Sequence, residues 1–396
     1  MIGTSDAATE LAAIRSTRDQ ARPIATAEHL QRLARAQALL PELGADALIV
    51  GAGHSLTYFT GIGWSMIERI VALVLIPGRA PVILCPAFEA GSLAAALKIP
   101  AEALLWQEDE DPYALLGALL AEAGLRRIAL DPVLPFGMAD AITRATPSAT
   151  VLSGAALIDA CRMRKSPAEL ALIRQAMAMT LEVQERAARI LHPGIRASEV
   201  TAFVQAAHRA IGSDGTTFCI VQFGASTAFP HGLPQDDVLA PGDMVLVDTG
   251  CLLHGYHSDL TRSYVFGSPD AEQRRIWAIE RAAQQAVFDA AGPGVACGAL
   301  DDAARAVLTR NGLGPDYRLP GLPHRSGHGL GMTIHEAPYL VRGNALPLAP
   351  GMCLSNEPMI VLPGRFGIRL EDHFHITETG AEWFTEPSPD IERPFG

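Results

Sequence analysis

Two carboxylates lie inside one apolar, strand-like segment of the sequence. In MVLVDTGCLLHGYHSDLTRSYVF, Asp248 and Asp259 are placed almost symmetrically about a turn near Leu253 to Gly255. If the segment folds as a hairpin, the two side chains come close to each other across the strands. Two anions held together require a cation or a shared proton, so this spacing indicates metal binding or acid–base chemistry. The alternative is a turn-associated Asp and an exposed Asp that pairs with Arg262.

A second segment, MCLSNEPMIVLPGRFGIRLEDHFHIT, repeats the arrangement. Glu357 and Glu371 are each seven residues from Gly364, which lies in the turn LPGR. We expect their carboxylates to meet across this second hairpin, because a Glu among Leu, Met, Ile and Val is rarely buried without a partner. A salt bridge to Arg369 is the alternative.

A glycine-rich stretch with three histidines lies between the two hairpins. In HRSGHGLGMTIHEAPYL, His328 has His324 and His335 on either side, and the glycines allow a close approach of the backbone. Taken alone, His328 is more typical of a structural histidine. Together with four carboxylates, it completes a donor set suited to two divalent metal ions. Oxygen-rich ligation favours Mn²⁺, with Co²⁺ or Zn²⁺ as alternatives.

The elements that must position these residues belong to the second of two predicted domains, residues 1–160 and 161–396. Helical and strand-like segments alternate in the first part, which indicates an α/β domain. The sequence Ser166-Pro167-Ala168-Glu169 has the N-cap, the proline and the first-turn acid of a long helix. The strand candidates of the later half follow one another as hairpins, so we predict an antiparallel sheet covered by helices and an α+β protein overall.

The composition is that of an ordinary globular protein and excludes some partners. The net charge is −12 and no block of Lys or Arg is present, which argues against nucleic acid. The six cysteines are scattered singly, as is typical of free thiols in a reducing compartment. The first residues lack the apolar core of a signal peptide, and Pro and Gly interrupt the most apolar stretch, residues 70–87. We therefore expect a cytoplasmic protein that does not bind membranes.

At these residues the sequence resembles the pita-bread metallopeptidases, the group of creatinase, aminopeptidase P and prolidase. The motifs that carry the resemblance are VDTG with Asp248, SDLTRSY with Asp259, GHGLGMTIHE with His328, NEP with Glu357 and GIRLED with Glu371. The resemblance is strong over residues 165–396. The motifs LTYFTGI and RKSPAEL also resemble the creatinase-like N-terminal domain, and the whole is most similar to Xaa-Pro dipeptidase (prolidase). The fold implied is a creatinase-like α/β domain followed by a pita-bread domain.

The resemblance also implies roles for the metal ligands. Asp248 would chelate one ion, Asp259 and Glu371 would bridge the two, and His328 would bind the second. Glu357 would be both a ligand and the general base toward a nucleophilic hydroxide that bridges the metals.

Three further histidines match active-site positions of the family. His231 would contact the substrate, His335 would stabilise the tetrahedral intermediate, and His324 would be a further active-site residue. Where aminopeptidase P and prolidases commonly have a Tyr, this sequence has Val361.

The implied activity is hydrolysis of the Xaa-Pro bond in dipeptides or short peptides by a homodimeric enzyme. Prolidases place a carboxylate-binding Arg between the second catalytic His and the metal-ligand Glu, and HEAPYLVRGN runs on from His335. The resemblance therefore implies that Arg342 binds the carboxylate of the substrate, with His231 assisting and Arg369 as a further substrate-binding residue. The alternative for Arg342 is a solvated loop residue. The alternative functions are an Xaa-Pro aminopeptidase acting on longer peptides, a creatinase-like amidohydrolase acting on a non-peptide compound, and a non-catalytic binding protein.

Overall fold

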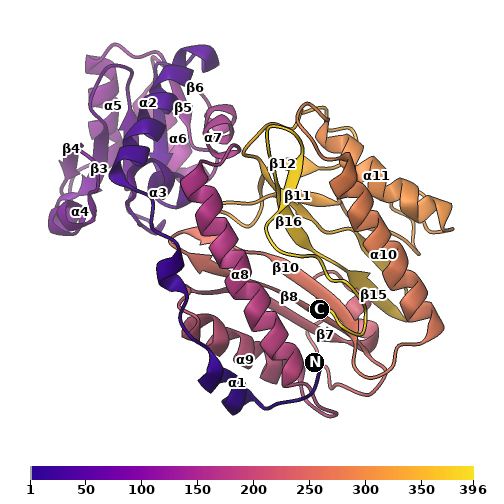
Figure 1. Cartoon of the computed structure of the whole chain (residues 1–396). Coiled ribbons are helices and arrows are strands. Elements are labelled where there is room, and N and C mark those ends of the chain that lie inside the picture. Colours follow the sequence, from indigo (N-terminus) through magenta and orange to yellow (C-terminus); the bar gives the residue numbers. More distant parts are fainter. Residues whose placement is uncertain (1) are drawn as a thin grey trace. The chain divides into compact units, whose positions relative to one another are not determined.

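The structure is a computed structural model and describes residues 2–396. The chain forms two compact units (Figure 1): residues 24–162 form one, and residues 163–396 form the other together with the segment before residue 24. The sequence analysis placed that segment in the N-terminal domain. The structure corrects this, because helix α1 (Ala7–Ala13) packs on helices of the second unit.

The unit of residues 24–162 is the predicted α/β domain. Its sheet has the order β4-β3-β2-β1-β5-β6, with parallel pairing except on the two sides of β2. The strands are β1 (Ala47–Gly51), β2 (Ala72–Leu75), β3 (Val82–Pro86), β4 (Glu102–Trp106), β5 (Arg127–Leu130) and β6 (Thr150–Ser153). The helices are α2 (Thr26–Leu43), α3 (His54–Thr60), α4 (Ala90–Ala96), α5 (Pro112–Glu122), α6 (Phe136–Ala145) and α7 (Ala155–Arg162), with a short 3-10 helix at Ala87–Glu89.

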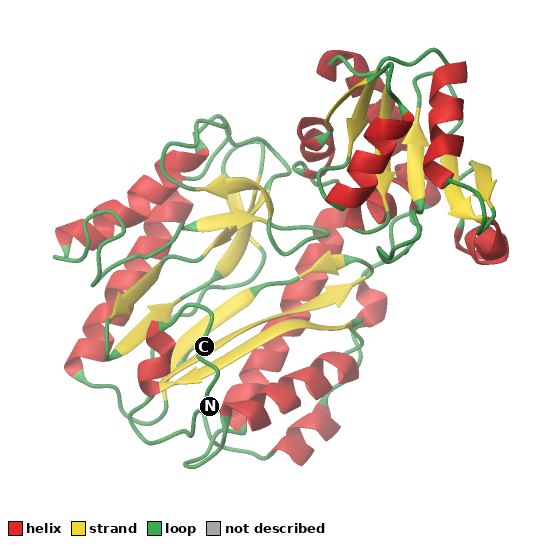
Figure 2. Cartoon of the chain, turned by 180° about the vertical axis from the view of Figure 1, so that it is seen from behind, coloured by secondary structure: helices red, strands yellow, loops and turns green. Residues whose placement is uncertain are grey.

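The second unit is built from antiparallel sheets and long helices (Figure 2). Its sheets have the orders β10-β8-β7, with β9 on β8, and β12-β11-β13-β16-β17, and β14 pairs with β15. The first strands are β7 (Gly215–Phe223), β8 (Met244–Leu253), β9 (Tyr256–His257) and β10 (Leu260–Val265). The later strands are β11 (Gly327–Gly329), β12 (Glu336–Leu340), β13 (Cys353–Asn356), β14 (Met359–Leu362), β15 (Phe366–Arg369), β16 (Asp372–Ile376) and β17 (Ala381–Trp383). The remaining helices are α8 (Pro167–Arg189), α9 (Ala197–Ala210), α10 (Ala271–Ala290) and α11 (Cys297–Arg310), with short 3-10 helices at Arg18–Gln20 and Gly224–Ala228.

Helix α8 begins where the sequence predicts. The side chain of Ser166 accepts a hydrogen bond from the backbone N–H of Glu169, and the Glu169 carboxylate accepts one from the backbone N–H of Ser166. This capping box satisfies two backbone donors that a helix start otherwise leaves unpaired. The other Glu169 oxygen accepts a hydrogen bond from Tyr256 at 2.9 Å, so the start of α8 is tied to strand β9.

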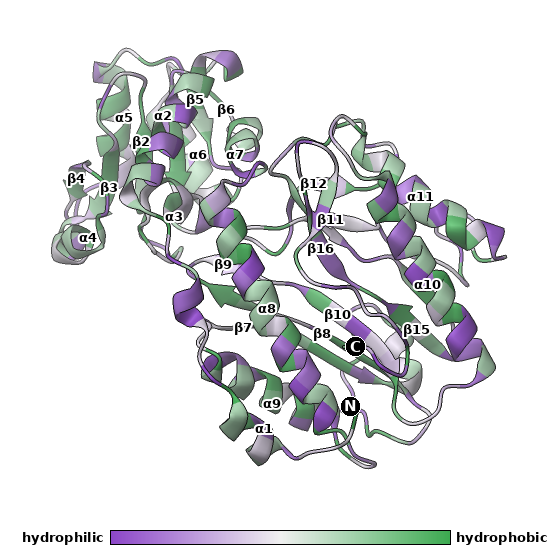
Figure 3. Cartoon of the chain, in the orientation of Figure 1, coloured by the Kyte–Doolittle hydropathy of each residue, from purple (hydrophilic) through white to green (hydrophobic). Residues whose placement is uncertain are grey.

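One core cluster of the second unit lies between helices α10 and α11 and the strands packed on them, from β8 to β16. Figure 3 shows hydrophobic residues along the inner strands and hydrophilic residues on the outward faces of α8 and α10. Val361 is 3% exposed and belongs to this core. Among residues 2–396, no helix is long and apolar enough to cross a membrane.

Candidate active site

The first hairpin brings Asp248 and Asp259 to one place, as the sequence predicts. Strand β8 pairs with β10 in a register that sets Asp248 opposite Thr261, and Asp259 lies just before β10. Both Asp side chains are buried, and Arg262 does not pair with them. Instead, Arg262 forms a fully buried salt bridge with Asp372 at 2.7 Å. The alternative of an exposed Asp paired with Arg262 is therefore wrong.

The second hairpin brings Glu357 opposite Glu371. Strand β13 pairs with β16 and β14 pairs with β15, and both ladders are centred on Gly364. The two glutamates occupy the break between the ladders. An antiparallel bridge between Glu371 and Thr261, with a 2.6 Å hydrogen bond from the Thr261 hydroxyl to the Glu371 carboxylate, joins this hairpin to the first one. All four predicted carboxylates therefore converge.

Strand β11 inserts His328 beside these carboxylates. Its Nε2 lies 3.0 Å from Oε1 of Glu357 and 3.7 Å from Oδ2 of Asp259, while its Nδ1 lies 3.0 Å from the carbonyl oxygen of Gly329. A Cβ atom at Gly329 would lie 2.4 Å from a backbone oxygen of Ala337. The glycine-rich motif thus allows β11 to pack closely enough for His328 to reach the acids.

The donor set fits divalent metal ions. The possible ligand atoms of His328, Glu357 and Glu371 lie within 4.8 Å of one another, as do those of Asp259, Glu371 and His373. Oδ1 of Asp248 and Oε1 of Glu371 are buried without a hydrogen-bond partner. Burial and the neighbouring carboxylates raise the pKa of Asp259 and Glu371 well above the ordinary values. Oxygens that are buried, unpaired and mutually repulsive are what a bound cation would stabilise.

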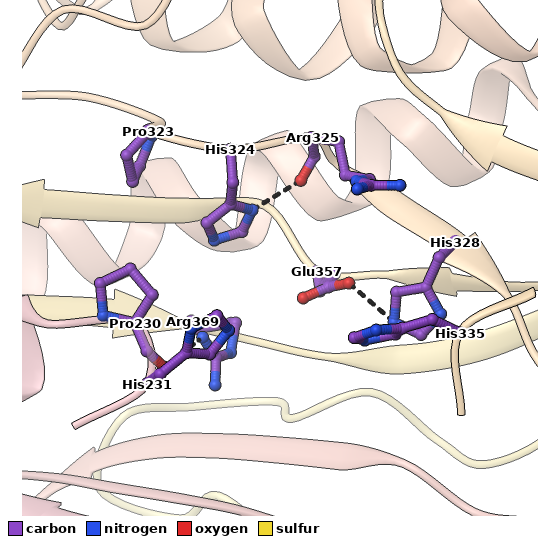
Figure 4. A pocket seen from close by; sticks show the side chains of 9 residues that line it. All are labelled: Pro230, His231, Pro323, His324, Arg325, His328, His335, Glu357 and Arg369. Carbon is purple, nitrogen blue, oxygen red and sulfur yellow. Dashed lines mark hydrogen bonds and ion pairs between the residues drawn. The ribbon is translucent and has the colours of Figure 1, made fainter. Parts of the chain in front are cut away.

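A cavity of about 330 Å³ opens beside this cluster (Figure 4). Its lining includes the predicted residues His231, His324, His335, Glu357 and Arg369, and it also includes residues that the sequence analysis did not single out, namely Pro230, Pro323 and Arg325. The figure shows Glu357 between the His328–His335 pair and the side that holds His231 and Arg369.

The environment of the cavity favours the neutral forms of two of its histidines, His324 and His335. Burial and the neighbouring His328 lower the pKa of His335 to about 4. Burial also lowers the pKa of His324. A neutral imidazole can donate a hydrogen bond from one nitrogen and accept one at the other, which suits contacts to a peptide.

The two predicted arginines are placed differently. Arg369 is buried in the site and lines the cavity, and it forms a salt bridge with Asp248, not with Glu357 or Glu371 as in the alternative reading of the second hairpin. Arg342 is not among the residues that line the cavity. Its exposed guanidinium binds Asp302 at 2.8 Å and also Asp316, and these carboxylates raise its pKa. The structure therefore does not bring Arg342 together with the other predicted residues.

Several residues at the site were missed in the sequence. Arg325 lines the cavity, and its guanidinium stacks over the ring of Tyr339 at 4.5 Å. His373 is fully buried beside Asp259 and Glu371. Arg325 lies inside the histidine motif, next to His324, so its position was a usable signal. His373 lies inside strand β16, between Asp372 and Phe374, and nothing in the spacing separates it from a structural histidine.

Residues 171–378 match Metallopeptidase family M24, and residues 32–164 match the Creatinase/Prolidase N-terminal domain. The probable dipeptidase PepE of Mycobacterium tuberculosis is 36% identical over 359 residues, which are 89% of this chain and 93% of that protein. The Xaa-Pro dipeptidase of Lactobacillus helveticus is 30% identical over 367 residues, which are 91% of this chain and 98% of the relative.

Solved structures agree with these sequence relatives. Dipeptidase PepE from Mycobacterium ulcerans superposes with a TM-score of 0.87 at 33% identity, over 94% of this chain and 99% of that one. The prolidase from Thermococcus sibiricus superposes with a TM-score of 0.83 at 27% identity, over 90% of this chain and 97% of that one. The predicted α+β fold, with a creatinase-like domain followed by a pita-bread domain, is confirmed. The chain therefore belongs to metallopeptidase family M24.

Proposed function

We propose that this protein is a dinuclear metal-dependent dipeptidase that hydrolyses the Xaa-Pro bond. One observation carries the proposal. Asp248, Asp259 and Glu371 are buried and converge with partly buried Glu357 and with His328. Histidines and arginines line the small cavity beside them. The relatives named Xaa-Pro dipeptidase support the choice of proline as the second residue.

The proposed metal ligands are Asp248, Asp259, His328, Glu357 and Glu371. Mn²⁺ is the proposed ion, because carboxylate oxygens outnumber nitrogens and thiolates are absent from the set. When bound, two such ions would lower the pKa of a water molecule and polarise the scissile carbonyl.

Glu357 is the proposed general base. Burial raises the pKa of its carboxyl group, but the hydrogen bond and charge of His328 outweigh burial and lower the pKa below the usual value. The group is thus held as a carboxylate that can accept a proton from water and pass it to the leaving nitrogen. His335 lies beside His328, with the ring centroids 4.2 Å apart, and its lowered pKa keeps it neutral. It would donate a hydrogen bond to the carbonyl oxygen as that oxygen gains negative charge.

Arg325 is the proposed partner of the C-terminal carboxylate of a dipeptide, in place of Arg342. Arg325 is exposed at the cavity and is pre-oriented by stacking on Tyr339, whereas the guanidinium of Arg342 already holds two carboxylates. A planar guanidinium matches a carboxylate with two parallel hydrogen bonds. A small cavity closed by a cation favours dipeptides over longer peptides.

Kinetics on matched substrates test both the proposed activity and the proposed contact between Arg325 and the substrate carboxylate. The Mn²⁺-loaded enzyme should cleave Xaa-Pro faster than Xaa-Pro-Yaa, Xaa-Ala or an amidino compound such as creatine. Arg325→Met should raise KM for Xaa-Pro roughly ten- to a hundredfold and change Xaa-Pro-amide much less, since the amide has no carboxylate to lose. Arg342→Met is the matched control and should leave both KM values near wild type.

Other outcomes would redirect the proposal. Faster cleavage of Xaa-Pro-Yaa would favour an aminopeptidase, and turnover of the amidino compound alone would favour a creatinase-like amidohydrolase. If Arg342→Met raised KM for Xaa-Pro but not for Xaa-Pro-amide, Arg342 would be the residue that binds the carboxylate. We also propose a cytoplasmic homodimer, and light scattering of the purified protein would test the dimer.

A further inference from the structure

The loop of residues 311–326 forms one wall of the cavity and has little regular structure of its own. It carries Pro323, His324 and Arg325, which all line the cavity, while its middle part, residues 315–320, is exposed. Such a loop loses conformational entropy when it is ordered, so something must hold it in place for a well-formed site.

A buried ion pair on helix α11 holds this loop. Asp301 and Arg305, one helical turn apart, are 0% and 3% exposed, and Nε of Arg305 donates to Oδ2 of Asp301 at 2.9 Å. The guanidinium then donates to backbone carbonyls of the loop, at 2.6 Å to Asp316, 3.2 Å to Leu322 and 2.6 Å to His324.

Two further residues of the loop, Tyr317 and Ser326, contact the ion pair of Asp301 and Arg305. The ring of Tyr317 covers the guanidinium at 4.1 Å. Oδ1 of Asp301 accepts a 2.6 Å hydrogen bond from the hydroxyl of Ser326, whose carbonyl accepts the backbone N–H of Glu357 at 2.9 Å. One buried carboxylate and one buried guanidinium therefore fix both ends of the segment that carries His324 and Arg325, and connect it to the proposed base.

A buried charge pair is costly unless its hydrogen-bonding groups are satisfied, and a hydrophobic pair of similar volume often stabilises a fold as well. Here the guanidinium directs its hydrogen bonds at the backbone of the cavity wall. Only a planar guanidinium can bind a carboxylate and several carbonyls at fixed angles. These contacts favour a role in shaping the cavity over a role in general stability.

We propose that Arg305, held by Asp301, is a positioning residue that sets the affinity for the C-terminal residue of the substrate. It acts through the backbone of His324 and its neighbours and does not touch the substrate. The inference rests on the proposed dipeptidase function. It predicts an effect on substrate affinity that exceeds the effect on turnover, because the metal ligands lie on other elements.

The test compares Arg305→Lys, Arg305→Met and Tyr317→Ala with Arg310→Met, all in the full-length Mn²⁺-loaded protein. Arg310 lies on the exposed side of the same helix. Arg305→Lys keeps the charge but loses the planar guanidinium with its several N–H donors. It should raise KM for Xaa-Pro roughly tenfold with kcat within about twofold. Tyr317→Ala, at an exposed position where the fold should tolerate the change, should raise KM in the same direction by a smaller factor.

Hydrogen exchange of residues 311–326 supplies a readout independent of activity. Exchange should rise in the Arg305 variants and stay at the wild-type level in Arg310→Met. Unchanged exchange and unchanged KM in Arg305→Lys and Tyr317→Ala would overturn the inference while an active wild-type enzyme kept the proposed function. A fall in kcat at constant KM would also overturn it. If the wild-type protein cleaved no dipeptide, the proposed function and the role in substrate affinity would fail together, and exchange would still decide whether Arg305 holds the loop.

Discussion

Two roles, metal ligand and general base, are proposed for the side chain of Glu357. It lies in the break between two strand ladders, where its carboxylate can leave the sheet and face the cavity. Oε1 contacts His328 at 3.0 Å, and the backbone N–H binds Ser326. Neighbouring groups therefore hold the backbone and one carboxylate oxygen of Glu357, and the residue lines the cavity.

Replacement of Glu357 by Gln should lower kcat at least a hundredfold with the fold intact, because an amide of the same shape cannot accept the proton of the nucleophile. The measurement is steady-state kinetics on Xaa-Pro, together with the metal content and circular dichroism of the variant. Glu378→Gln, at an exposed position, is the control and should behave as wild type. Wild-type kcat in Glu357→Gln with both ions bound would exclude Glu357 as the base.

At the residue scale the sequence predicts side chains within hairpins better than those on loops. Side chains alternate between the two faces of a strand, and Glu357 and Glu371 are equally far from the turn at Gly364. The sequence spacing alone therefore predicts that their carboxylates meet. Arg342 and Arg325 both lie in irregular segments, and only the side chain of Arg325 lines the cavity. That depends on contacts such as the salt bridges of Arg342 with Asp302 and Asp316, residues 40 and 26 positions away, which no local pattern encodes.

At the scale of elements the same contrast separates helix α8 from helix α11. Helix α8 has a capping box and a proline at its start, and the sequence predicts its first residue correctly. Helix α11 begins after Ala296, which makes no side-chain cap, and the sequence analysis did not predict it. Helix α11 packs on α10 and β12, and this packing stabilises it in the absence of a side-chain cap. Tertiary contacts therefore define this helix.

Helix α9 carries a titratable group that should make stability depend on pH. His208 is fully buried and lies 3.2 Å from the hydroxyl of Thr180 and 2.9 Å from that of Thr216. Burial lowers its pKa to about 4. Between pH 4 and 6.5 the unfolded chain binds a proton at this residue that the folded chain does not. Stability should therefore be complete above pH 6.5 and decline by about 3 kcal/mol as the pH falls to 4.

Urea unfolding at pH 7 and at pH 4.5, in the presence of a chelator, would measure this contribution. His208→Gln should lose less stability over that interval than wild type, whereas His192→Gln, at an exposed site, should lose as much as wild type. Equal losses in wild type and His208→Gln would show that His208 is not responsible.

At the scale of the whole molecule, the change from alternating helix and strand signals to hairpins predicts two parts. The sequence could not predict that the segment before residue 24 belongs to the second unit. That segment is held by single contacts with distant residues, such as the salt bridge of Arg18 with Asp214 at 2.8 Å and that of Arg186 with Glu10 at 3.0 Å. Charges of this kind are common on solvated surfaces, so they do not identify their partners.

Metal removal should affect one unit and leave the other unchanged, because all proposed ligands lie in residues 163–396. Elemental analysis of the Mn²⁺-loaded protein should find two ions per chain, and chelation should abolish activity until Mn²⁺ is restored. Hydrogen exchange should increase on chelation in β8, β10 and the strands around Glu357, with no change in β1, β2 and β5. Full activity without metal, or an equal increase throughout the chain, would contradict the assignment.

The route of the chain through its two units also has a consequence for synthesis on the ribosome. The residues before position 24 are made before the unit of residues 24–162, yet partners such as Arg186 and Asp214 are made only after it. That unit has a complete sheet and its own core, so it can fold while the leading segment is still without its partners. The residues before position 24 are therefore made early but ordered late, when the unit of residues 163–396 folds and supplies their partners.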